Sequence, residues 1–165
     1  MRQSEIFQPG VGSVKEHLAC LDLKPEAQPK FQQARPVAYA EKDEISRELD
    51  RLVEVGYYSP VDSSQWASPV VSVRKPDGAI RLCGDYKRTL NPQLDMMIYP
   101  LPIVEDCFVS MKGGQHFSKI DIKQAYNSIP LRESDQLLAT INTHKGLYKP
   151  LSLPFGINSA TSIFQ

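Results

Sequence analysis

The sequence predicts an α+β fold in which antiparallel hairpins pack with helices. Residues 41–55 carry the apolar period of a helix, whereas residues 69–85 and 137–151 each hold two short strand patterns separated by a turn. Helical and hairpin segments are mixed along the chain, which favours the α+β class. A length of 165 residues is sufficient for one domain with a hydrophobic core.

The first residues of the chain show a different composition. Residues 1–33 are punctuated by proline and glycine and develop no periodic apolar face. We expect an irregular lead-in or linker that can drape over the domain, and we place the domain itself at residues 34–165. The N-terminus lacks the apolar core of a signal peptide.

The first predicted helix covers residues 41–55. Its apolar side chains recur at i, i+4, i+7 and i+8, which places on one face Ile45, Leu49, Leu52 and Val53. Gly56 follows as a stop signal, and acidic residues outnumber basic ones in this segment, so we expect a solvated acidic outer face.

The first predicted hairpin pairs residues 69–74 with residues 79–85. The turn is Pro-Asp-Gly at 76–78, where glycine permits a positive φ. Ile80 and Leu82 alternate on one face of the return strand. A helix is expected at residues 102–111, because proline suits its first turn and two glycines end it.

A strand is predicted at residues 117–122, followed by a helical turn at 123–127. The second hairpin pairs residues 137–142 with residues 147–151 around a Thr-His-Lys-Gly turn. A last helix is expected to start after an N-cap at Asn158 or Ser159.

Bulk composition limits the classes of protein. Nineteen basic and nineteen acidic residues cancel, so net charge argues neither for nor against nucleic acid. Three cysteines without C-x-x-C spacing predict buried free thiols in a reducing compartment. Because no apolar run approaches about 18 residues, we expect no membrane span and an intracellular, soluble protein.

Asp121 is the first candidate for chemistry. A carboxylate at the end of a buried strand faces a cleft, and Mg²⁺ prefers such hard oxygen ligands. Tyr126 lies five residues further along and could project toward the same place. The pattern is equally consistent with an aspartate that caps the following turn and a tyrosine of the core.

Two further segments have the chemistry of a nucleotide site. Residues 74–88 hold five basic and two acidic side chains, and bases on a hairpin suit a polyphosphate. The Leu-Pro-Phe-Gly turn at 153–156 would set backbone N–H groups and an aromatic ring beside a cleft. The alternatives are a solvated surface hairpin and ordinary turn geometry.

In this order the motifs resemble the reverse transcriptase (RNA-directed DNA polymerase) of gypsy-type LTR retrotransposon Pol polyproteins, in its N-terminal fingers and palm portion. The resemblance runs from about residue 30 to the last residue. Its signatures are residues 34–39, 48–52, 66–71, 77–78, 81–87, 90–92, 99–102, 117–121, 141–148 and 153–156.

The resemblance implies a partial right-hand polymerase, with the fingers and the first half of the palm in residues 34–165. Residues 1–33 resemble the protease–polymerase connector. By resemblance the metal ligands for Mg²⁺ are the catalytic Asp121 and the backbone carbonyl of Ile122. By resemblance the dNTP-binding residues are Lys75 and Arg81 on the triphosphate, Tyr126 at the sugar 2′ position, and Phe155 and Gly156 against the nucleotide.

The chain departs from the family pattern at a few positions. Thr161 stands where relatives usually carry proline, and Gln124 stands where they often carry serine. Asn127 and Ser128 also differ from the usual pair. These departures leave the expected fold unchanged and affect only the expected positioning of the substrate.

The resemblance also implies binding partners, and it implies that catalytic residues are missing from these 165 residues. The intact enzyme would bind a template-primer of RNA or DNA, dNTP and the remainder of the Pol polyprotein. The family's Tyr-x-Asp-Asp motif is not among these residues, which contain no Asp-Asp pair. We therefore expect the isolated chain to be inactive. The alternative is a non-catalytic module, derived from a retroelement, that binds nucleic acid or a polymerase.

Overall fold

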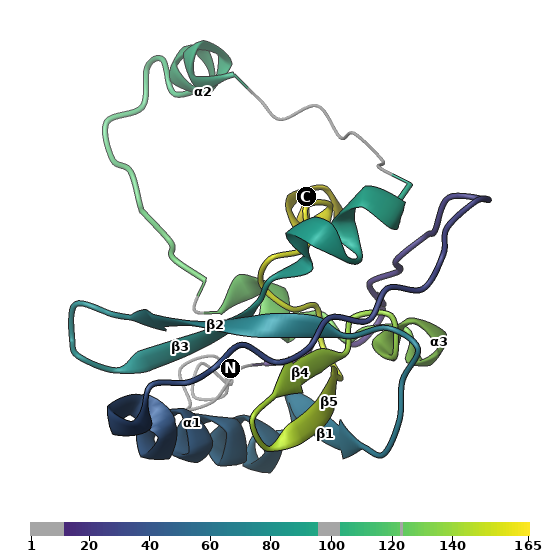
Figure 1. Cartoon of the computed structure of the whole chain (residues 1–165). Coiled ribbons are helices and arrows are strands. Elements are labelled where there is room, and N and C mark those ends of the chain that lie inside the picture. Colours follow the sequence, from purple (N-terminus) through teal and green to yellow (C-terminus); the bar gives the residue numbers. More distant parts are fainter. Residues whose placement is uncertain (1–11, 96–102, 123) are drawn as a thin grey trace.

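A five-stranded sheet forms the centre of the molecule (Figure 1). The computed structural model describes residues 12–95, 103–122 and 124–165. The strands lie in the order β1-β5-β4-β2-β3. They are β1 (Tyr58–Val61), β2 (Ser68–Arg74), β3 (Ile80–Gly84), β4 (Ile141–Thr143) and β5 (Gly146–Pro150). Only the β2–β4 pair is parallel among these strands, and the α+β prediction is confirmed.

Helix α1 (Lys42–Glu54) follows the short 3₁₀ helix η1 (Tyr39–Glu41) and packs on β3 and β1. Ile45, Leu49 and Leu52 are buried, as the apolar period predicts. The helix ends at Glu54, and Gly56 shortly after it has a φ of 78°, the left-handed conformation common just past a helix C-terminus.

The predicted β2–β3 hairpin is confirmed. Arg74 pairs with Ile80, and Gly78 in the turn has a φ of 84°. The second hairpin is shorter than predicted, because residues 137–140 are not in a strand. Among the α-helices and strands of the described residues, two were missed: the four-residue helix α3 (Glu133–Gln136), and β1, whose proline is typical of an edge strand.

Residues 14–32, called the strap below, cross the body of the domain in an extended conformation. Ala19 and Leu21 belong to the hydrophobic core. The Ala19 N–H donates to the Pro130 carbonyl at 2.8 Å, and the Gln32 N–H donates to the Ala67 carbonyl at 2.9 Å. The irregular lead-in therefore contributes core side chains and backbone hydrogen bonds.

Several of the motifs lie on short helices. They are η2 (Tyr86–Arg88), η3 (Asn91–Gln93), η4 (Ala125–Ser128) and α4 (Ala160–Phe164). Of these, α4 lies across the sheet from α1 (Figure 1). Helix α4 starts after Ser159 as expected, although that side chain makes no capping hydrogen bond. The turn expected at 123–127 is the 3₁₀ helix η4, and Lys123 lies outside the described residues.

Residues 103–122, called the arm below, stand away from the sheet (Figure 1). They include α2 (Val104–Ser110), which is shorter than the predicted helix at 102–111. Residue 102 lies outside the described residues. The cysteine prediction is wrong here, since Cys107 is exposed and the other two thiols are only partly buried.

The strand predicted at residues 117–122 is wrong. This part of the arm has no regular structure, and the exposed fractions of Phe117, Ile120 and Ile122 are 64%, 86% and 57%. A strand requires a neighbour for its backbone hydrogen bonds. Among the described residues no strand pairs with this segment, so its alternating apolar pattern has no sheet to join.

Among the helices of residues 12–95, 103–122 and 124–165, none is long and apolar enough to cross a membrane.

Candidate functional site

Four of the predicted site residues come together beside the end of β3. The Phe155 ring lies at the centre, with the Arg81 guanidinium carbon 5.5 Å from its centroid. On another side the Tyr126 ring lies 5.4 Å away, and Tyr126 also meets Phe164 at 5.9 Å. A cation and rings in tilted and edge contact are thus presented together, on segments that are distant in sequence.

Two glycines allow the 155–158 turn to lie on the sheet. Gly156 has a φ of 100°, and a Cβ at this position would lie 2.4 Å from the Gly84 carbonyl oxygen. A Cβ on Gly84 would in turn lie 2.4 Å from the Tyr86 ring. The backbone of the turn therefore approaches β3 as closely as glycine alone permits.

The Tyr86 ring packs next to both glycines, Gly84 and Gly156. It is fully buried, and its hydroxyl donates to the Ala139 carbonyl at 2.9 Å. Burial raises the pKa of Tyr86 well above its ordinary value, and burial also raises the pKa of Tyr58. Burial raises the pKa of the Cys83 thiol, which the charge of Arg81 opposes. These three groups are therefore neutral at pH 7.

Asn91 and Thr161 make three hydrogen bonds to the cluster and its turn, and sequence reasoning predicted none of them. Asn91 donates from Nδ2 to the Gly156 carbonyl at 2.9 Å and accepts from the Asn158 N–H at 3.1 Å. The Tyr126 hydroxyl lies 3.1 Å from the Thr161 hydroxyl. The sequence signal for Asn91 was its place in the Leu-Asn-Pro signature, which marks the family but assigns no role.

Lys75 lies apart from this cluster. It is in the connection between β2 and β3, where its backbone N–H donates to the Ala79 carbonyl at 2.8 Å. Among the described residues, no ion pair or cation–ring contact joins its side chain to Arg81, Tyr126 or Phe155. The joint grip of Lys75 and Arg81 on a triphosphate stays a prediction.

Asp121 and Ile122 lie in the arm rather than at the end of a strand. Both are exposed. In the part of the chain that the structure describes, no three side chains of His, Cys, Asp or Glu are close enough to hold a metal ion together. The arrangement offers Asp121 as a single accessible carboxylate.

A cationic surface borders the cluster. An open groove of about 580 Å³ is lined by Gln32, Gln33, Arg35, Pro69, Asp85, Lys87 and Arg88. Arg35 pairs with Asp85, which leaves Lys87 and Arg88 as the cations of the groove that form no ion pair among the described residues. Lys87 also lines a neighbouring groove with Lys24 and Asn91.

Comparison with known proteins connects this geometry to one family. The family model described as reverse transcriptase (RNA-dependent DNA polymerase) matches residues 73–165, which is more than half of the chain. An uncharacterized protein of Caenorhabditis elegans is 40% identical over 163 residues, covering 98% of this chain and 13% of that protein. The Transposon Tf2-3 polyprotein of Schizosaccharomyces pombe is 36% identical over 99 residues, covering 60% of this chain and 7% of the polyprotein.

Solved structures share the fold. The native prototype foamy virus protease-reverse transcriptase superposes with a TM-score of 0.76 and 21% identity, covering 95% of this chain and 20% of that chain. The foamy viral protease-reverse transcriptase dRH in complex with ds DNA gives a TM-score of 0.73 and 19% identity, covering 95% of this chain and 27% of that chain. The chain thus spans only a small part of the proteins it resembles.

Proposed function

Because this chain belongs to the reverse transcriptase family, we propose that it forms the fingers and part of the palm of a retrotransposon RNA-directed DNA polymerase. The intact enzyme would add dNTPs to a primer 3′-OH under the direction of an RNA or DNA template. The similarity to a transposon polyprotein supports a gypsy-type Pol polyprotein as the source of the remaining segments.

The observation that carries this proposal is the gathering of Arg81, Tyr126 and Phe155 around the Gly156 turn. The planar guanidinium of Arg81 suits phosphate oxygens, and Lys75 at the end of the β2–β3 hairpin would add a second cation. The Phe155 ring offers a face to the nucleotide. Tyr126 would crowd the sugar 2′ position and so favour deoxynucleotides.

Magnesium fits the donors of the arm only in part. The Asp121 carboxylate and the Ile122 carbonyl are hard oxygen ligands of the kind that Mg²⁺ prefers. When bound in the intact enzyme, the ion would neutralise charge that develops on the phosphates. A two-metal site needs further carboxylates, and no Asp-Asp pair occurs in the 165 residues. We expect weak binding by this chain and derive no catalytic step from it.

The isolated chain should therefore be inactive. Purified residues 1–165 are incubated with an RNA template, an annealed DNA primer, dNTPs and Mg²⁺ or Mn²⁺. The expected result is no extension of the primer above the no-protein control. Template-dependent incorporation would overturn the expectation that the isolated chain is inactive. Neither result would change its membership of the family.

A second candidate is a non-catalytic nucleic-acid-binding module, favoured by the groove that contains Lys87 and Arg88. Filter binding to single-stranded RNA at rising salt detects phosphate contacts, because such contacts make affinity fall with salt. Two variants then distinguish the polymerase fragment from the binding module. Loss of binding on Arg81→Ala supports a working nucleotide surface on the fingers. Binding that survives Arg81→Ala but is lost on Lys87→Gln favours the module.

A further inference from the structure

The position of the Phe155 ring is set by the backbone of its turn. The ring lies near both Arg81 and Tyr126, through one cation contact and one tilted ring contact, each more than 5 Å between centres. Such contacts are individually weak, about 1 kcal/mol each. They cannot by themselves fix a turn that carries a glycine with positive φ.

Close packing holds the inner side of the turn. Gly156 already rests against the Gly84 carbonyl, and Ile157 is buried in the hydrophobic core with 5% exposure. The residues on either side of Ile157, Gly156 and Asn158, are exposed, so this packing alone does not fix the orientation of their peptide groups. A second restraint on the outer side would fix that orientation and with it the direction in which the Phe155 ring projects.

Asn91 supplies that restraint with both ends of its amide. Nδ2 donates to the Gly156 carbonyl at 2.9 Å, while Oδ1 accepts from the Asn158 N–H at 3.1 Å. The two bonds span the turn on either side of residue 157. Either bond alone would hold one exposed residue of the turn, whereas the pair holds both residues that flank the buried Ile157.

The amide itself is held on a rigid base. Asn91 opens η3, and its neighbours Leu90 and Leu94 are fully buried. The Gln93 N–H donates to the Leu90 carbonyl at 2.9 Å, which closes the turn that carries Asn91. The restraint on the outer side therefore connects the 155–158 turn to the core rather than to a loop.

We infer that Asn91 is a positioning residue for the nucleotide site: it holds the 155–158 turn against β3 so that the Phe155 ring stays beside Arg81 and Tyr126. The inference rests on the proposed function in one respect, since it takes Phe155 as a nucleotide contact. That Asn91 holds the turn and the Phe155 ring in place does not depend on the proposed function.

The test compares Asn91→Ala with Asn91→Asp and with Asn142→Ala in residues 1–165. Asn91→Asp keeps an oxygen for the Asn158 N–H but loses the donor to Gly156. Asn142 is the matched control, because its amide also donates to a backbone carbonyl, that of Gln32 at 3.1 Å, away from the aromatic cluster. Circular dichroism verifies that each variant folds.

Two readouts are taken. Nuclear Overhauser contacts between the Phe155 ring and Arg81 report the geometry without ligand. Titrations with dTTP and with inorganic tripolyphosphate, both with Mg²⁺, report binding. Loss of the two hydrogen bonds should weaken dTTP binding about five- to tenfold. Tripolyphosphate, which lacks base and sugar, should change much less.

The inference is supported if Asn91→Ala loses the ring contacts and the dTTP affinity, Asn91→Asp is intermediate, and Asn142→Ala keeps both. It is overturned if Asn91→Ala retains the ring contacts, or if both alanine variants merely melt earlier. Should Asn91→Ala fail to fold, Asn91→Asp decides by the same contacts. A wild-type chain that binds dTTP no better than tripolyphosphate would refute the proposed nucleotide site, while the ring contacts would still decide the role of Asn91.

Discussion

Tyr86 links the stability of the fold to pH. Burial keeps its phenol neutral and raises its pKa above the ordinary 10.0, so the folded state retains a proton that the unfolded state loses. The contribution of this residue is therefore complete below about pH 10 and is lost as pH rises further, by up to about 1.4 kcal/mol per pH unit for one proton.

Replacing Tyr86 by phenylalanine tests this linkage. At pH 7 the variant should be less stable by about 1–2 kcal/mol, because the Ala139 carbonyl loses its donor. Above pH 10 its stability should fall less steeply than that of the wild type, since one of the buried phenols is gone. Urea unfolding from pH 7 to pH 11 measures both effects. Tyr39→Phe, at a 92% exposed tyrosine, is the control, and equal alkaline slopes for all three proteins would contradict the argument.

Single residues were predictable where local chemistry decides and not where tertiary contacts do. Arg81, Tyr126, Phe155 and Gly156 were named from the resemblance to the reverse transcriptase family, whose motifs can be recognised along the sequence; the structure brings them together, and their roles stay predictions. Asn91 could not be assigned a role in this way, because its two partners lie 65 and 67 positions away in sequence. A hydrogen bond of that range leaves no periodic signal.

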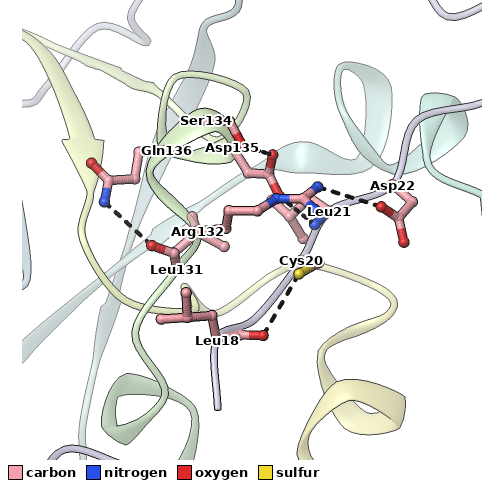
Figure 2. Close-up of polar contacts among 9 residues, drawn as sticks. All are labelled: Leu18, Cys20, Leu21, Asp22, Leu131, Arg132, Ser134, Asp135 and Gln136. Atoms are coloured by element: carbon pink, nitrogen blue, oxygen red, sulfur yellow. Dashed lines mark hydrogen bonds and ion pairs between the residues drawn. The ribbon is translucent and has the colours of Figure 1, made fainter. Parts of the chain in front are cut away.

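The strap is the element whose role in the fold the sequence did not reveal. Figure 2 shows how it is fastened: Asp135 accepts from the Leu21 N–H at 2.8 Å, from Arg132 Nε at 2.9 Å and from the Ser134 hydroxyl at 2.9 Å. The carboxylate is buried, with only 4% exposure. Three donors converging on one buried carboxylate are sensitive to loss of its charge.

Asp135→Asn should therefore loosen the strap. The amide retains the shape but offers a weaker acceptor and sets an NH₂ group against donors, at a cost of about 2–3 kcal/mol. Trypsin cleavage after Lys15 and Lys30, followed by mass spectrometry, should become faster. Asp22→Asn is the control, because that aspartate is mostly exposed and lies 3.4 Å from Arg132. Equal cleavage of the two variants would disprove the role of Asp135.

Elements with strong local patterns were predicted better than elements defined by their neighbours. Helix α1 and the β2–β3 hairpin are encoded by their own apolar periods and by Gly56 and Gly78. Residues 117–122 were predicted wrongly, because their local pattern is not sufficient to form a strand. Their alternation is that of a strand, but pairing depends on a second segment, and no described strand lies beside them.

The whole molecule combines a well-packed body with an arm of exposed apolar side chains. The exposed fractions in the arm reach 65% for Phe108, 71% for Val109 and 86% for Ile120. The body by contrast buries one continuous hydrophobic core. An exposed apolar surface of this kind favours association with other apolar surfaces, because burying it removes it from water.

The isolated chain should therefore bind a hydrophobic dye and self-associate as its concentration rises. The double variant Phe108→Asp/Ile120→Asp should reduce dye fluorescence and shift sedimentation toward the monomer, with little change in melting temperature, because neither side chain contributes to the core. Val55→Asp, at a half-exposed valine of α1's C-terminus, is the matched control and should leave both readouts near wild type. If the arm variant and the control give the same dye signal and the same sedimentation, the association does not arise from the arm.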